Sequence, residues 1–305
     1  MAKKIIIAGA TGLIGANLCK ALKERGDLIS VLTRDPAKGE KIIPFAENIY
    51  EWDPGTQKDY SAFLEGADAV INLSGAPVIG PKWTEAYKKE ILESRINSAR
   101  VLVDSMAKCK NKPKVFVCSS AVGYYGDMKT EVITEKTPAG KDFLADVCRL
   151  WEEEAAKAEK YGIRHVSVRT GIVLEKKGGA LAKMVLPFRL FVGGSLASGE
   201  QWFSWIHWRD LCNIYVFAMD NDKINGPLNA TAPIAETMKQ FAKILGSVLN
   251  RPALFNVPEF VLKLLLGEGV SAIIASQRVI PAVLNKAGFK FEFIKAEDAL
   301  KDILK

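Results

Sequence analysis

The sequence is poor in the residues that most often bind metals or form disulfide bridges. It contains two histidines and five cysteines in 305 residues, and no two cysteines stand in a Cys-x-x-Cys arrangement. Three of the cysteines, Cys19, Cys118 and Cys148, lie within apolar patterns. This usage favours reduced core thiols in a cytoplasmic protein over disulfide bridges, and we expect no metal site.

The sequence also lacks a membrane-spanning run and a strong excess of one charge. No apolar stretch reaches the ~18 residues that span a bilayer. The apolar run after the first lysines ends at Gly9, too early for a signal peptide. The net charge of +7 is spread over interspersed lysines and carboxylates, which is typical of solvated faces. We therefore expect a protein with no nucleic-acid or membrane partner.

What is present is a long alternation of strand and helix patterns. Continuous apolar runs predict strands at 4–8, 28–33, 48–51, 69–73, 115–119 and 165–170. Helix-period segments between them predict helices at about 13–25, 84–108 and 142–161. Thr84 is expected to cap its helix, and Gly26 and Gly162 to end theirs. This series predicts an α/β fold, a Rossmann doubly wound parallel sheet.

The pattern changes after Thr170. Residues 178–208 are rich in glycine and tryptophan, and we expect loops over a cleft there. Residues 204–220 return to a strand and a helix, and helices broken by prolines follow from about 234. We expect 1–175 plus about 204–232 to form a Rossmann domain. About 176–203 plus 233–305 would form a smaller C-terminal substrate lobe.

The dinucleotide site is predicted at the first strand–helix junction, "IIIAGATGLIGANL". Gly9 permits a tight turn, Gly12 lets the backbone approach a pyrophosphate, and Gly15 lets helix and strand pack closely. Thr11, Leu13 and Ile14 complete the expected contacts in this turn. After the fourth strand, "NLSGAP" offers small residues, including Ser74 and Gly75, that let backbone line the groove.

The tip of the second strand indicates which dinucleotide is bound. Thr33 and Arg34 stand where an NAD-preferring site would place a carboxylate. A guanidinium suits a 2′-phosphate, so we expect NADP(H) in preference to NAD(H). Asp35, one residue later and followed by proline, is expected to point away. The alternative for Arg34 is a solvated surface charge.

These motifs carry a family resemblance. Further stretches that share it run nearly end to end: "SRINSAR", "SSAVGYYG", "DFLADVCRLWE", "VRTGIVL", "GGALAKM", "SWIHWRDL" and "QRVIPAVLNKAGFKFEF". With them the chain resembles an atypical or extended short-chain dehydrogenase/reductase. More narrowly, it is similar to the NAD(P)-dependent epimerase/dehydratase-like subgroup often labelled as a cell-division-inhibitor homologue.

The resemblance implies particular cofactor contacts. It implies NADP(H) binding at Thr33 and Arg34, with Leu73 and Ser74 under the cofactor. It adds Glu90 and Arg95 from the helix at 84–108, where Arg95 would reach the phosphates; the alternative is a surface ion pair between those two. Val173 and the strand-ending Ser119 complete the residues it implies.

The resemblance breaks at the catalytic residues. Ordinary members carry a tyrosine that moves the substrate proton and a lysine four residues later on the same helical face. Here the aligned positions are Phe143 or Leu144 and then Val147 or Cys148. The usual catalytic Ser/Thr position falls on Ala121. Tyr125 and Lys129 match the spacing, but glycine and aspartate between them predict a turn that separates the two side chains.

Three other side chains are candidates for the missing acid or base. Tyr124 would act at the strand end, with an aromatic wall as its alternative role. Cys148 faces the same way as the lost lysine, with a buried inert thiol as its alternative. His207 would shuttle a proton, or would be held by Asp210 or by backbone. The aromatic cluster Trp202, Phe203, Trp205 and Trp208 would line a cleft or pack between lobes.

Two functions therefore stand at this point. The first is an NADP(H)-dependent oxidoreductase or epimerase with non-standard catalytic residues, acting on an unidentified small molecule, such as a nucleotide sugar or another carbonyl compound. The alternative is a catalytically weak or silent NADP(H)-binding regulatory protein, linked by its family label to cell division. The helices at 84–108 and 142–161 occupy the places where extended relatives dimerise, so a homodimer is the corresponding expectation.

Overall fold

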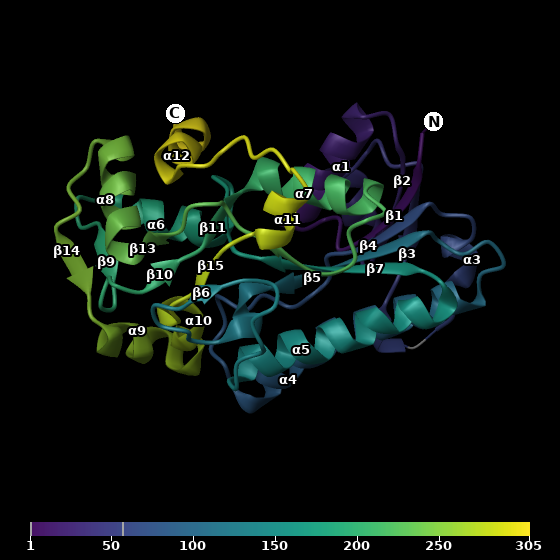
Figure 1. The fold of residues 1–305 in the computed structure, drawn as a ribbon, viewed down its shortest axis with the longest axis horizontal. Coiled ribbons are helices and arrows are strands. Elements are labelled where there is room, and N and C mark those ends of the chain that lie inside the picture. Colours follow the sequence, from purple (N-terminus) through teal and green to yellow (C-terminus); the bar gives the residue numbers. More distant parts are fainter. Residues whose placement is uncertain (1, 57) are drawn as a thin grey trace.

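The centre of the protein is a seven-stranded parallel sheet (Figure 1). The computed structural model describes residues 2–56 and 58–305. The sheet order is β12-β7-β5-β4-β1-β2-β3, with bounds β1 Lys4–Ala8, β2 Leu28–Thr33, β3 Asn48–Glu51, β4 Ala69–Asn72, β5 Val115–Ala121, β7 Arg164–Thr170 and β12 Gly226–Ala230. The order reverses between β1 and β4, the point at which doubly wound sheets bind their ligands. The predicted fold class is confirmed.

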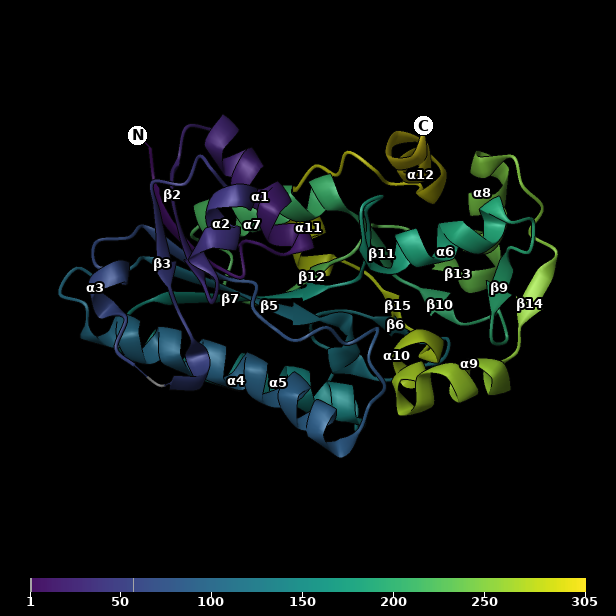
Figure 2. The ribbon, with the colours of Figure 1, turned by 180° about the vertical axis from the view of Figure 1, so that it is seen from behind.

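Helices cover both faces of this sheet (Figures 1 and 2). On one face lie α1 (Leu13–Glu24) and α7 (Trp208–Asp220); on the other lie α4 (Glu85–Lys108) and α5 (Phe143–Ala156). Short helices α2 (Pro36–Ile42) and α3 (Ser61–Leu64) complete this part. The central strands are mostly apolar because alternate residues enter opposite cores: Ile5 and Ile7 enter one, and Ile6 enters the other. Within residues 2–56 and 58–305, no helix is long and apolar enough to cross a membrane.

The six predicted strands and three predicted helices are confirmed, with ends shifted by a few residues. The capping predictions hold as well. The Thr84 hydroxyl accepts a hydrogen bond from the Tyr87 backbone N–H, and Gly162 ends its segment in the left-handed region at φ 75°. The last turn of the predicted helix at 142–161 tightens into a 3₁₀ helix over Lys157–Tyr161.

A second apolar core lies beyond the carboxyl ends of the strands. It is formed by α6, α8 and the C-terminal α12 together with short strands. The helices and strands not yet given are β6 Val132–Ile133, β8 Ile172–Leu174, α6 Gly179–Arg189, β9 Gly194–Leu196, β10 Trp202–Phe203, β11 Trp205–His207, β13 Glu236–Thr237, α8 Met238–Leu249, β14 Phe255–Val257, α9 Glu259–Leu266, α10 Ser271–Ile274, β15 Arg278–Val279, α11 Ala282–Lys286 and α12 Ala296–Leu304.

The expectation of loops over 178–208 was wrong for its first third. Residues 179–189 form helix α6, which buries Leu181, Val185 and Phe188 on one face. The glycine pair at its start and Pro187 near its end lower the helix propensity of the segment. Burial of this apolar stripe against α8 outweighs that low propensity.

Candidate functional site

The glycine turn after β1 is built for close backbone approach. Gly9 has φ 77°, and a Cβ there would lie 2.8 Å from the Leu73 carbonyl carbon. A Cβ at Gly15 would lie 2.6 Å from the Ala10 Cα. Gly12 caps α1 without a side chain, so the first N–H groups of the helix have no capping partner and face the turn. Such a helix start favours an anionic ligand.

A groove of about 820 Å³ opens at this turn. It runs between the ends of β1, β2 and β4 and the first half of α4. Nine predicted cofactor residues line it: Gly9, Thr11, Gly12, Thr33, Arg34, Leu73, Ser74, Gly75 and Glu90. The volume falls within the range of cofactor-sized sites.

Two buried polar atoms on this groove lack a partner within the described residues. They are the Ser74 hydroxyl oxygen and the Trp52 indole nitrogen. A buried polar group without a hydrogen bond costs about 1–3 kcal/mol, so such an atom beside a groove indicates a ligand that completes it. Together with the glycine turn, these atoms fit a dinucleotide.

The tip of β2 presents cations to the groove. Arg34 and Lys38 are exposed and both line it. The Asp35 carboxylate instead caps α2, accepting a hydrogen bond of 3.0 Å from the Lys38 backbone N–H. Asp35 is therefore turned toward its own helix, as expected. Lys38 is not among the cofactor residues predicted from the sequence. The signal that could have found it is its position in the first turn of the helix that follows Arg34.

Arg95 lies directly beside the groove. A Cβ built on Gly75 would lie 3.0 Å from the Arg95 Cζ. Its guanidinium donates to the Ile91 carbonyl and lies 5.3 Å from the Trp151 ring centroid. None of the ion pairs formed within residues 2–56 and 58–305 includes Arg95, and burial lowers the pKa of its guanidinium. The surface ion pair that was the alternative interpretation is thus not formed.

The other predicted cofactor residues lie around the groove rather than on its lining. Leu13 begins α1 and approaches Gly178, while Ile14 and Gly15 lie in the first turn of α1. The Ser119 hydroxyl is 2.7 Å from the Tyr215 hydroxyl. Val173 pairs with Ile206 between β8 and β11.

Helix α5 presents apolar side chains where ordinary relatives place tyrosine and lysine. Phe143 and Leu144 stand in its first turn, and Val147 and Cys148 one turn later are buried. Cys148 is 4% exposed, and burial raises the pKa of its thiol to about 11. A thiol with that pKa is protonated at neutral pH and is a poor nucleophile.

Tyr124 lies over a buried polar network. The Arg169 guanidinium stacks on its ring with Cζ 3.5 Å from the centroid, and it is paired with Glu152 at 2.7 Å. Tyr125 is fully buried and donates to Asn229. Arg169 and Asn229 therefore hold the 3₁₀ turn Val122–Tyr125 in place through its two tyrosines.

His207 is fully buried and stacks on Phe293, with ring centroids 3.9 Å apart. Its Nδ1 accepts from the Arg209 backbone N–H, and its Nε2 lies 3.1 Å from the Asp302 carboxylate. Of the two alternatives, the backbone contact is present. The Asp210 contact is not, because that carboxylate accepts from the Glu292 and Phe293 backbone. None of His207, Tyr124 and Cys148 lines the groove or the smaller cavity between α6, α8 and α10.

Burial of His207 makes stability depend on pH. Burial lowers its pKa to about 4, and Asp302 only partly offsets this. The unfolded chain, with pKa about 6.5, takes up the proton first. The stabilisation is therefore complete above pH ~6.5 and is lost as the pH falls toward 4.

We expect the free energy of unfolding to fall by about 2 kcal/mol through His207 alone between pH ~6.5 and ~5. Urea titrations at both pH values measure it. His207→Gln is expected to show a correspondingly shallower pH dependence, while retaining that of the other buried histidine, His165. An unchanged pH dependence in His207→Gln would contradict the assignment.

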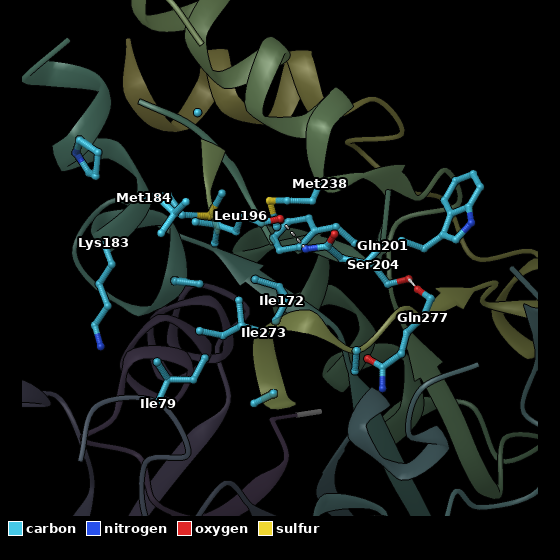
Figure 3. Close-up of a pocket in the computed structure, with 18 of the residues that line it drawn as sticks. Ile79, Ile172, Lys183, Met184, Leu196, Gln201, Ser204, Met238, Ile273 and Gln277 are labelled. Atoms are coloured by element: carbon cyan, nitrogen blue, oxygen red, sulfur yellow. Dashed lines mark hydrogen bonds between the residues drawn. The ribbon is translucent and has the colours of Figure 1, made fainter. Parts of the chain in front are cut away.

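A second, smaller cavity of about 200 Å³ lies between α6, α8 and α10 (Figure 3). Trp202 and Phe203 line it, whereas Trp205 is fully buried behind them. Trp208 packs against the core between the lobes. The aromatic cluster thus divides between the two roles that its sequence left open.

Comparisons with known proteins agree with this geometry. A family model described as NAD dependent epimerase/dehydratase family matches residues 5–230, and a domain of unknown function (DUF1731) matches 257–303. The chain is 42% identical to Epimerase family protein SDR39U1 homolog, chloroplastic, of Arabidopsis thaliana, over 98% of this chain and 86% of that protein. It is 37% identical to Epimerase family protein YfhF of Bacillus subtilis, over 98% and 97%. The crystal structure of human epimerase family protein SDR39U1 with NADPH superposes with a TM-score of 0.88, 32% identity and 98% coverage of both chains.

Proposed function

The chain belongs to the NAD-dependent epimerase/dehydratase family, and from that premise we propose that it is an NADP(H)-dependent oxidoreductase acting on a small carbonyl or alcohol compound. The proposed binding of NADP(H) rests on the groove, where a glycine turn, a buried unpartnered Ser74 hydroxyl and two cations meet. The human relative that was crystallised with NADPH supports the same choice.

Particular residues would hold the cofactor. Gly9 and Gly12 would admit the pyrophosphate at the start of α1. Arg34 and Lys38 would neutralise the 2′-phosphate. Ser74 would gain the hydrogen bond that its hydroxyl lacks. When bound, NADPH supplies a hydride to a carbonyl carbon, and the carbonyl oxygen takes up a proton.

Substrate would bind beside the groove, in the lobe formed by about 176–203 and 233–305. We propose that division of the chain because a separate apolar core lies there. The proton donor differs from that of ordinary relatives, since α5 carries no tyrosine–lysine pair. Tyr124 is the best placed of the three sequence candidates, being half-buried at the end of β5. A homodimer through α4 and α5 and a cytoplasmic location stay predictions.

Replacing Arg34 tests the choice of dinucleotide. Loss of a charge-assisted hydrogen bond costs about 1.5–3 kcal/mol, so Arg34→Ala should weaken NADPH binding roughly 10–100-fold. NADH binding should change little, because NADH lacks the phosphate. Quenching of tryptophan fluorescence measures both affinities, since Trp52 lines the groove.

Lys41→Ala is the matched control, a cation removed from the same helix at an exposed position off the groove. It should leave both affinities unchanged. Equal weakening of NADPH and NADH in Arg34→Ala would contradict a 2′-phosphate contact.

The proposed hydride transfer is tested by incubating the protein with NADPH and a panel of ketones and aldehydes. We expect NADP⁺ and alcohol to form in equal amounts. Because α5 carries no tyrosine–lysine pair, one alternative function remains: a regulatory protein that binds NADP(H) without transferring a hydride. NADPH that binds tightly and is never consumed would favour that alternative.

A further inference from the structure

The smaller cavity (Figure 3) and the dinucleotide groove are lined by residues that are near neighbours in the chain. Pro77 lines the groove and Ile79, two residues later, lines the cavity. Ile172 lines the cavity next to Val173, a predicted cofactor contact. A ligand in the cavity would therefore lie next to a cofactor in the groove.

The polar side chains of the cavity are already engaged within the protein. Gln201 donates to the Leu196 carbonyl and accepts from Ser198. Ser204 donates to the Gln277 carbonyl at 2.6 Å and accepts from the Val279 N–H. These groups fix the walls of the cavity and have little hydrogen-bonding capacity left for a ligand.

Gln277 offers a ligand one polar atom. Both hydrogens of its amide are donated, at 3.0 Å each, to the carbonyls of Val122 and Gly126. Its Oε1 is therefore the atom it can offer, an acceptor suited to a hydroxyl group. The same two hydrogen bonds tie the cavity wall to the turn that carries Tyr124.

The remaining lining is apolar. It includes Ile172, Met184, Leu196, Phe203, Met238 and Ile273. Among the described residues that line the cavity, one is charged: Lys183, which is exposed at the edge of the cavity. A diphosphate buried here would face one cation where burial of its charges requires several partners.

Size leads to the same class of ligand. A cavity of about 150 Å³ lined by leucine, isoleucine and phenylalanine accommodates benzene. The 200 Å³ here holds one ring with a few attached atoms. Most sites for larger ligands exceed about 300 Å³.

We propose that this cavity is the substrate site and that it takes a small apolar ketone or the corresponding secondary alcohol, not a nucleotide sugar. This deepens the proposed function and rests on it. The alcohol hydroxyl would donate to Gln277 Oε1. The ketone has no hydrogen to donate, so packing of its apolar body between α6, α8 and α10 would hold it.

Binding of acetophenone to the full-length protein tests the proposal, measured by saturation-transfer NMR without and with NADPH, with UDP-glucose as the contrasting probe. We expect acetophenone to bind and UDP-glucose not to bind. Ala180→Phe, which fills the cavity from α6, should weaken acetophenone binding at least ~10-fold by occluding the space. Leu186→Phe, on the same helix but 59% exposed, should change it less than ~2-fold.

Met184→Ala enlarges the cavity from the same helix and should admit 2-acetonaphthone, which we expect to be too large for the wild type. UDP-glucose binding in place of acetophenone, or acetophenone binding that neither cavity variant alters, would overturn the proposal. The measurement without NADPH tests acetophenone binding by itself, so failure of NADPH to bind or to react would count against the proposed function alone. The NADPH affinity of each variant, expected to stay within ~2-fold of wild type, shows that the groove is intact.

Discussion

Arg169→Met is expected to lower the free energy of unfolding by about 3–5 kcal/mol, a large share of the stability of a typical domain. Arg169 is 3% exposed and donates two hydrogen bonds to Glu152, of 2.8 and 2.7 Å. Burial alone would lower its pKa, but the hydrogen bonds and charge of Glu152 raise it above its usual value. Removing the guanidinium leaves a largely buried carboxylate whose remaining side-chain partner among residues 2–56 and 58–305 is Ser120.

The network links several strands and a helix, so its loss should destabilise more than one of them. Arg169 on β7 donates at 2.9 Å to the Tyr125 hydroxyl, which donates at 2.6 Å to Asn229 on β12. Glu152 on α5 accepts at 2.6 Å from Ser120 on β5. Breaking it should loosen the turn Val122–Tyr125 as well as the sheet edge.

Urea unfolding measures the effect. Lys263→Met is the control, since Lys263 pairs with Glu259 on the exposed face of α9 and such pairs contribute about 0.3–0.5 kcal/mol. Adding Glu152→Gln to Arg169→Met should recover part of the loss, because the uncompensated charge is then gone. A loss below ~1 kcal/mol in Arg169→Met would show that water or rearrangement satisfies Glu152.

Gly12→Val is expected to weaken NADPH binding at least ~100-fold while leaving the fold intact, because the backbone must approach the pyrophosphate there. Gly12 has φ −79°, which any residue adopts. The nearest atom to an added Cβ is the Gly9 carbonyl oxygen, at 3.3 Å. That contact is tight, but it is the single one that the described residues make within 4 Å of the added Cβ, so the new side chain mainly occupies the groove.

Gly15→Val provides the contrast. Its Cβ would lie 2.6 Å from both the Ala10 Cα and the Gly9 oxygen, so the helix and strand would have to separate. We expect Gly15→Val to lower the melting temperature of the cofactor-free protein and Gly12→Val to leave it nearly unchanged. Melting curves with and without NADPH separate the two effects. Wild-type NADPH affinity in Gly12→Val would contradict the assignment of the groove.

The parts of the fold that depend on local pattern could be predicted from the sequence. The strands are continuous apolar runs, and the glycines of the first turn carry their own geometric reason. Helix α6 could not be predicted, because its glycine pair and Pro187 oppose helix formation and only packing against α8 explains it. The partner of His207 was also out of reach, since Asp302 lies 95 residues away in the chain.

The site divided in the same way. The glycine turn and the Arg34 tip follow from spacing along a strand and helix, and Lys38 follows Arg34 by one helical turn, whereas Trp52 reaches the groove only through the fold. The smaller cavity draws its lining from residues 79–277. No local pattern marks such a set, because its members come together only when the lobe forms.

The most direct measurement of hydride transfer uses NADPH deuterated at the transferable carbon. The full-length protein is loaded with it and incubated with a small-molecule extract, and the metabolites are analysed by mass for deuterium. We predict that label moves to one compound, an apolar secondary alcohol, and that Gly12→Val abolishes the transfer. Tight NADPH binding with all of the label retained on the cofactor would contradict an oxidoreductase and favour a protein that only holds NADP(H).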